Sequence, residues 1–146
     1  MVLRRQVKRS SLILAICSIA LLLFSATAHA ETKADCNSIH SGPCTRQAAG
    51  RSISLEINPR PVRHMTDLTF TVTVTPCTAL PSILILDLSM PGMYMGKNQV
   101  TMRKKSDCTW EGKGLIVRCM SGRKLWQATI LSNDLGNPAF SFDVRD

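Results

Sequence analysis

A period of two in the apolar residues is the feature that most constrains the fold of this chain. In LTFTVTVT, residues 68–75, apolar side chains alternate with four threonines, and SISLEI, residues 52–57, alternates in the same way. Successive side chains of a β-strand point to opposite faces, so this alternation is typical of strands that bury one face. No stretch of the sequence shows a sustained helical period. The chain is therefore predicted to be all-β.

Five further segments are predicted to be strands, because they are apolar or alternating and are separated by proline and glycine. They are ILILDL at 83–88, NQVTMRK at 98–104, TWEGKGLIVRC at 109–119, LWQATIL at 125–131 and FSFDV at 140–144. About seven short strands in roughly 100 residues are typical of an immunoglobulin-like antiparallel β-sandwich. We expect this domain to span residues 51–146, with Trp110 and Trp126 in its core.

The first thirty residues have the composition of a secretory signal peptide rather than of a folded segment. Four basic residues precede the apolar stretch LILAICSIALLLFS, and Ala28-His29-Ala30 offers small residues where signal peptidase requires them. The stretch is short for a membrane span, which needs roughly 20 residues, although an uncleaved anchor is the alternative. Residues 31–146 are thus predicted to be periplasmic or secreted, with membrane contact only through an uncleaved signal segment.

Charge and motif content argue against several classes of function. The whole chain of 146 residues has 18 Lys and Arg against 10 Asp and Glu, and four basic residues precede residue 30, which leaves a net charge of +4 beyond it. The remaining basic residues are scattered and not interleaved with aromatic residues, so we expect no nucleic-acid partner. The sequence has no nucleophile elbow, no zinc-protease motif and no glycine-rich phosphate loop, and we expect no enzymatic activity.

Export would place the cysteines in an oxidising compartment, where most of them are expected to pair. Five follow the signal segment: Cys36, Cys44, Cys77, Cys108 and Cys119. Residues 31–50 are polar and lack periodicity, so they are predicted to form an N-terminal arm that a Cys36–Cys44 disulfide closes. The odd number predicts one thiol left over.

The order of the strands sorts the other three cysteines. If consecutive strands run up and down, alternate loops gather at the same end of the domain. The loops at one end are then residues 60–67, 89–96 and 119–123. Cys77 and Cys108 fall at the opposite end and are predicted to pair, which leaves Cys119 free. The alternative is a tight turn at Gly112-Lys113-Gly114, which would make Cys108 and Cys119 hairpin partners.

The shared loop end collects side chains that suit a soft metal ion. The turn MPGMYM provides Met90, Met93 and Met95. The loop at 60–67 adds His64 and Met65, and the loop at 119–123 adds Cys119. Thioether, thiol and imidazole groups are donors that suit Cu(I), so these six residues are the predicted ligands and copper is the expected metal. The alternative is ordinary packing, since methionine also fills irregular gaps at the edge of a core.

The segment LSMPGMYMGKNQVTM, followed by TWEGKGLIVRCMSGRKLWQATI, resembles the YtkA-like/FixH-like family of β-sandwich domains. Residues 90–96 match the family's MPxMxMG-type turn, residues 122–126 loosely match its GxW strand start, and the resemblance covers about residues 50–144. It implies an exported or membrane-tethered domain linked to copper handling or cytochrome oxidase assembly. Two functions are therefore expected as alternatives: an envelope protein that binds or delivers Cu(I), or a disulfide-stabilised domain that binds another envelope protein and has no metal role.

Overall fold

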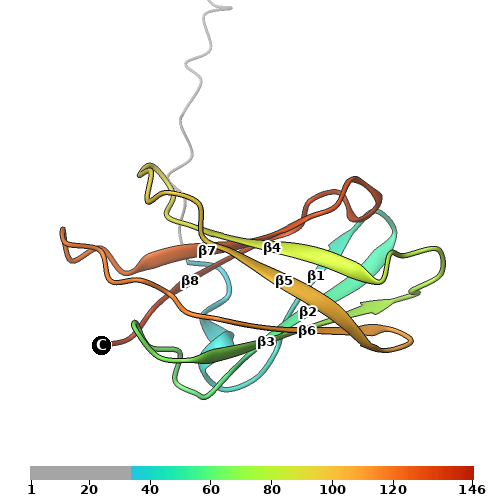
Figure 1. Ribbon diagram of the computed structural model, residues 1–146, viewed down its shortest axis with the longest axis horizontal. Helices are drawn as coiled ribbons and strands as arrows, with labels where there is room; N and C mark the ends of the chain where they lie inside the picture. Colours follow the sequence, from blue (N-terminus) through green and yellow to red (C-terminus); the bar gives the residue numbers. More distant parts are fainter. Residues whose placement is uncertain (1–33) are drawn as a thin grey trace, which may run out of the picture. The chain divides into compact units, whose positions relative to one another are not determined.

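Eight antiparallel strands form one sheet in the computed structural model, which describes residues 34–146 (Figure 1). The strands are β1 (Cys44–Ala48), β2 (Arg51–Asn58), β3 (Leu68–Thr75), β4 (Ile83–Ser89), β5 (Gln99–Ser106), β6 (Thr109–Gly114), β7 (Leu125–Leu131) and β8 (Ala139–Asp143). Their order across the sheet is β1-β2-β3-β6-β5-β4-β7-β8, and the sheet curls until it is nearly closed into a barrel. Two 3-10 turns, η2 (Asn37–His40) and η3 (Asn133–Leu135), complete the secondary structure of the described residues. The predicted all-β class is confirmed.

The structure has one strand more than the seven segments predicted, because β1 lies inside the segment predicted to be an irregular arm. The strand predicted at residues 109–119 is also shorter, since β6 ends at Gly114. β1 pairs with β2 through the two-residue turn Ala49-Gly50, where both residues have positive φ, 49° and 69°. Such a turn matches the twist of the two strands it joins. The sequence CTRQA has no apolar alternation, because β1 is an edge strand whose side chains are mostly outside the core.

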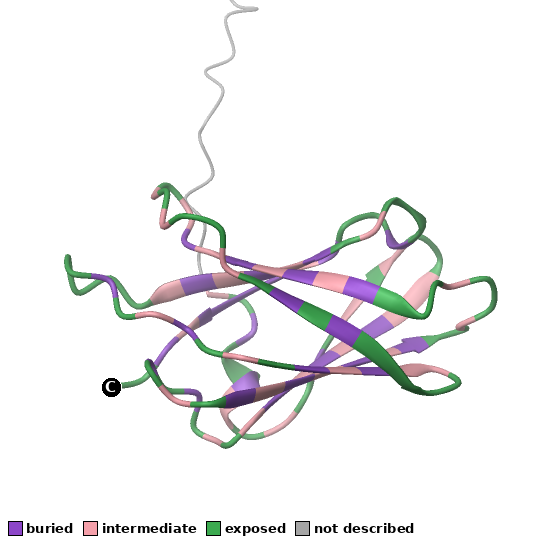
Figure 2. Ribbon diagram, in the orientation of Figure 1, coloured by how far each residue is buried: buried purple, intermediate pink, exposed green. Residues whose placement is uncertain are grey.

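The interior is filled by the alternating residues that the sequence indicates. Ile53, Leu55 and Ile57 of β2 are fully buried, and both tryptophans are buried as well. Figure 2 shows this alternation as bands of buried residues along the central strands. The Trp110 indole N–H donates to the carbonyl oxygen of Pro81 at 2.9 Å, so this ring fills the core without leaving its polar atom unpaired.

Two glycines of β6 make room for the neighbouring strand. A Cβ added at Gly112 would lie 2.7 Å from the backbone oxygen of Thr101, from Met102 Sδ and from Val100 Cγ1, and one added at Gly114 would lie 2.6 Å from Val100 Cγ2. The Gly112-Lys113-Gly114 segment is therefore a strand against which β5 packs closely, and not a turn. The turn between β5 and β6 lies at Asp107-Cys108 instead.

Both predicted disulfides are present. Cys77 bonds to Cys108 at the end of the sheet opposite the methionine turn, and Cys36 bonds to Cys44 in the N-terminal segment. Cys119 is free, so the alternative pairing of Cys108 with Cys119 is absent.

The N-terminal segment connects the two edges of the sheet. The backbone N–H groups of Asp35 and Cys36 both donate to the carbonyl oxygen of Ser141 in β8, at 2.9 and 2.8 Å, while the disulfide ties Cys36 to β1. His40 adds a second link, because its Nε2 lies 2.7 Å from the carbonyl oxygen of Asp143 and its Nδ1 accepts from the Val62 N–H at 3.2 Å. The predicted arm is thus an integral part of the fold.

The predicted signal peptide, residues 1–30, lies outside the described residues. Within residues 34–146 no helix is long and apolar enough to cross a membrane. All eight strands, both disulfides and a continuous buried core lie within this part of the chain, which therefore has what a domain needs to fold alone.

Candidate soft-metal site

Three loops and the end of the chain meet at the left-hand side of Figure 1. The loops are residues 59–67, 90–98 and 115–124. The Met65 N–H donates to the carbonyl oxygen of Ile116 at 2.9 Å, which joins the first loop to the third, and Arg123 Nη2 donates to the carbonyl oxygen of Pro91 at 3.1 Å, which joins the third to the second. The common loop end predicted from the strand order is confirmed.

The methionine turn begins where β4 ends. Met90 and Met93 form a β-bridge, with the Met93 N–H donating to the Met90 carbonyl oxygen at 3.1 Å. Gly92 takes a φ of 74° between them, a conformation that L side chains rarely adopt, and this explains the Pro-Gly pair. Met90 is only 3% exposed and belongs to the core, whereas Met93 and Met95 are partly buried at its edge. Core packing therefore explains why a methionine stands at position 90, and it explains Met93 and Met95 less fully.

Cys119 brings a thiol to this turn. Its Sγ lies 3.5 Å from Met93 Sδ, to which it can donate, and 2.9 Å from the Ser121 hydroxyl oxygen. The thiol is almost fully buried, at 4% exposure. Hydrogen bonds from the Ser121 hydroxyl and backbone N–H, followed by the backbone and charge of Arg123, lower the pKa of Cys119 against the opposing effect of burial. The loop thus makes the thiolate, which is the form that binds metals and reacts, easier to form than in a free cysteine.

The pair of sulfur atoms fits a soft ion. In a trigonal site, two sulfur atoms that each lie about 2.3 Å from the metal ion are about 4 Å apart. Cys119 Sγ and Met93 Sδ are 3.5 Å apart, so the two side chains would have to separate only slightly to hold an ion between them. One anionic and one neutral soft donor suit Cu(I) better than a hard cation. Among residues 34–146 no group of three or more His, Cys, Asp or Glu side chains is placed to hold a metal ion, so a site at Cys119 depends on thioether donors.

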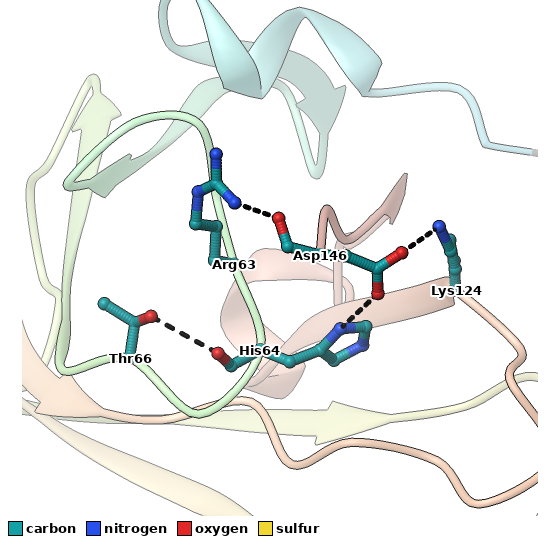
Figure 3. A network of polar contacts seen from close by, with 5 residues as sticks. All are labelled: Arg63, His64, Thr66, Lys124 and Asp146. Carbon is teal, nitrogen blue, oxygen red and sulfur yellow. Dashed lines mark hydrogen bonds and ion pairs between the residues drawn. The ribbon is translucent and has the colours of Figure 1, made fainter.

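His64 lies at the same end and faces Asp146 at the end of the chain (Figure 3). Its side chain is buried, its Nδ1 lies 4.0 Å from Asp146 Oδ1, and both ring nitrogens lack a hydrogen-bond partner. Burial, and then the charge of Arg118, lower the pKa of His64, while Asp146 opposes the shift. In the described part of the chain no hydrogen bond or ion pair joins this ring to the sulfur atoms, and its role as a ligand stays a prediction.

Met65 is placed beside the third loop by its backbone, but its side chain is 64% exposed. It is therefore not held against Cys119 or Met93 as a preformed ligand would be, and its role too stays a prediction.

Sequence reasoning missed two residues that shape this end. Ser121 lowers the pKa of the Cys119 thiol, and Asp146 faces His64 while its carboxylate also pairs with Lys124, which lowers the pKa of Asp146. The effect of Arg123 on the Cys119 thiol was expected from its nearby position in the sequence. Ser121 was detectable in principle, because a serine two residues from a polar group in a turn commonly bonds back to it. Asp146 was not, because only the pairing of β7 with β8 brings the chain end to this loop cluster.

Comparisons of the chain with protein-family models, with curated proteins and with solved structures find no match.

Proposed function

We propose that this protein is exported and binds Cu(I) through the thioether of Met93 and the thiolate of Cys119, with Met95 and Met90 as adjacent donors. The observation that carries the proposal is the 3.5 Å approach of two sulfur atoms from loops 26 residues apart in sequence. A thiol in an exported protein that is neither in a disulfide nor surrounded only by aliphatic carbon calls for an explanation, and a soft ion supplies one.

The position of the pair suits transfer of the ion rather than permanent storage. Cys119 is buried, but it lies next to Met120 and Ser121, which are exposed, and Met93 is followed by the exposed Tyr94. Ligands on loops can be exchanged one at a time with those of an acceptor, without unfolding of the sheet. We therefore propose delivery of Cu(I) in the envelope, in copper handling or oxidase assembly.

Strand order supports a relationship to immunoglobulin-like sandwiches. Without β1 and the β4–β5 pairing, the sheet divides into β2-β3-β6-β5 and β4-β7-β8. Lettered A to G in chain order, these are ABED and CFG, the two sheets of a constant-type immunoglobulin domain. This agreement supports the resemblance to YtkA-like/FixH-like domains, and the two disulfides support an oxidising compartment. The proposal therefore includes membership of this family and location in an oxidising compartment outside the cytoplasm.

The test is anaerobic titration of residues 31–146, with both disulfides intact and the Cys119 thiol unoxidised, with Cu(I) in competition with a chromogenic Cu(I) chelator. We expect one equivalent to bind, and Met93→Leu or Cys119→Ser to weaken the affinity at least about tenfold, because each removes one of few ligands. Met102→Leu is the matched control, since this methionine is fully buried on β5 and is no candidate ligand. Uptake that both loop variants leave unchanged would refute the site.

A second candidate function is supported by the packing of the methionines. Met90 is buried and Met93 and Met95 contact the core, as gap-filling side chains do. On this hypothesis the protein is a disulfide-stabilised interaction domain without a metal. It predicts that the titration shows no stoichiometric uptake and that Met93→Leu leaves the affinity for a protein partner unchanged.

A further inference from the structure

The loops at the two ends of the sheet differ in charge. The loops and chain end around the sulfur pair, residues 59–67, 90–98, 115–124 and 144–146, contain seven basic and two acidic residues, a net charge of +5. The basic residues are Arg60, Arg63, Lys97, Arg118, Arg123, Lys124 and Arg145. The loops of the opposite end, residues 49–50, 76–82, 107–108 and 132–138, contain two acidic residues and no basic one. The basic residues near them lie on strand ends, where Arg51 donates to the carbonyl oxygens of Pro76 and Thr78 and Lys105 pairs with Glu111. The molecule therefore presents a cationic end, which we define as these first four segments.

Most of these cations are not neutralised by the protein itself. Among the described residues only Arg60 and Lys124 of this set form side-chain ion pairs, with Glu56 and Asp146. Lys97, Arg118 and Arg145 are exposed and make no ion pair there. An uncompensated cluster of this kind raises the local concentration of anionic partners.

The cationic end also projects apolar side chains into water. Six large hydrophobic residues of the described chain are exposed, and four of them lie here: Met65, Tyr94, Leu115 and Met120. Tyr94 is 90% exposed and Met120 is 100% exposed, so neither packs against the other or against the sheet. In Figure 2 the loops of this end are largely exposed, in contrast to the banded strands.

We propose that the cationic end docks on an anionic lipid surface, with Tyr94 and Met120 inserted among the headgroups and the surrounding Lys and Arg held over the lipid phosphates. The combination of apolar and aromatic tips with basic neighbours is the one that binds a bilayer interface. Single, fully exposed side chains on separate loops enter lipid without any matching pocket, whereas a protein partner must supply a complementary shape for each. The proposal is independent of copper binding.

The experiment is cosedimentation of residues 31–146 with vesicles, in the presence of a copper chelator. One set of vesicles is phosphatidylcholine alone and the other contains equal parts of phosphatidylcholine and phosphatidylglycerol. We expect binding to the anionic vesicles only, and weaker binding at high salt because the charges are screened. Lys97→Gln and Arg118→Gln should each weaken the partition about fivefold, since a basic residue near such a surface contributes about that factor.

Apolar insertion is tested separately. Tyr94→Ser and Met120→Ser should each weaken partition about tenfold, because burial of a large apolar side chain contributes at least that factor. Ile83→Ser is the matched control: Ile83 is 45% exposed at the opposite end, and its replacement should leave partition unchanged. Circular dichroism establishes that every variant is folded. Absence of binding to anionic vesicles at low salt, or equal losses in Ile83→Ser and Met120→Ser, would overturn the proposal.

Discussion

Removal of the Cys77–Cys108 disulfide gives a loss of stability whose size follows from its place in the chain. Both cysteines are only partly buried, so their replacement by alanine creates little cavity, and the loss reflects mainly the freedom regained by the unfolded chain. The bridge spans 31 residues, for which the chain-entropy relation gives about 12 cal/mol/K, or about 3.7 kcal/mol at 25 °C. For a domain of roughly 115 residues this corresponds to a fall in Tm of about 15 °C.

The assay is urea unfolding, followed by tryptophan fluorescence, of Cys77→Ala/Cys108→Ala in a Cys119→Ser background, which prevents thiol exchange. The parent in the same background is the control. We expect a lower midpoint with a slope that is at most slightly steeper, since the unlinked chain unfolds to a more open ensemble. A loss below about 1 kcal/mol would refute the reasoning, because it would mean that the link restricts the unfolded chain far less than its span implies.

Two further predictions concern the core and the loop end. Gly112→Ala should destabilise the protein by about 1–3 kcal/mol in the same urea assay, because the new Cβ would collide with the backbone of β5, whereas Gly42→Ala, which meets no atom within 4 Å, should be nearly neutral. The pKa of His64 is lowered in the folded state, mainly by burial, so as the pH falls below about 6.5 the unfolded chain takes up a proton first and the free energy of unfolding decreases. His64→Gln should remove this part of the decrease between about pH 7 and the folded-state pKa, and an unchanged pH profile would contradict the burial of a neutral ring.

Local patterns predicted much of the fold. Strict alternation in β2 and β3 identified both strands and their buried faces, because one face of each is covered along its whole length. The up-and-down order of the strands then predicted which loops share an end, and with them the Cys77–Cys108 disulfide and the approach of Cys119 to the methionine turn.

What the sequence did not predict depends on contacts between distant segments. β1 was missed because an edge strand with mostly exposed side chains needs no apolar alternation. The single curled sheet follows from the pairing of β4 with both β5 and β7, which no local pattern encodes. His64, in the polar segment PVRHMTD, is buried where the loop meets the end of the chain at Arg145 and Asp146, a contact that no local pattern encodes. Met65 beside it is exposed, so adjacent positions in this loop differ widely in burial.

The N-terminal segment that links β8 to β1 also governs how the domain comes apart. The first described residues contact the last strand, β8, through hydrogen bonds to the carbonyl oxygens of Ser141 and Asp143. Thermal fraying of either segment, or a force that pulls them apart, therefore acts on the same few hydrogen bonds. The Cys36–Cys44 bridge fastens one side of this contact covalently. Without that bridge, the two edge strands β1 and β8 would be linked through the N-terminal segment by these hydrogen bonds and side-chain packing alone.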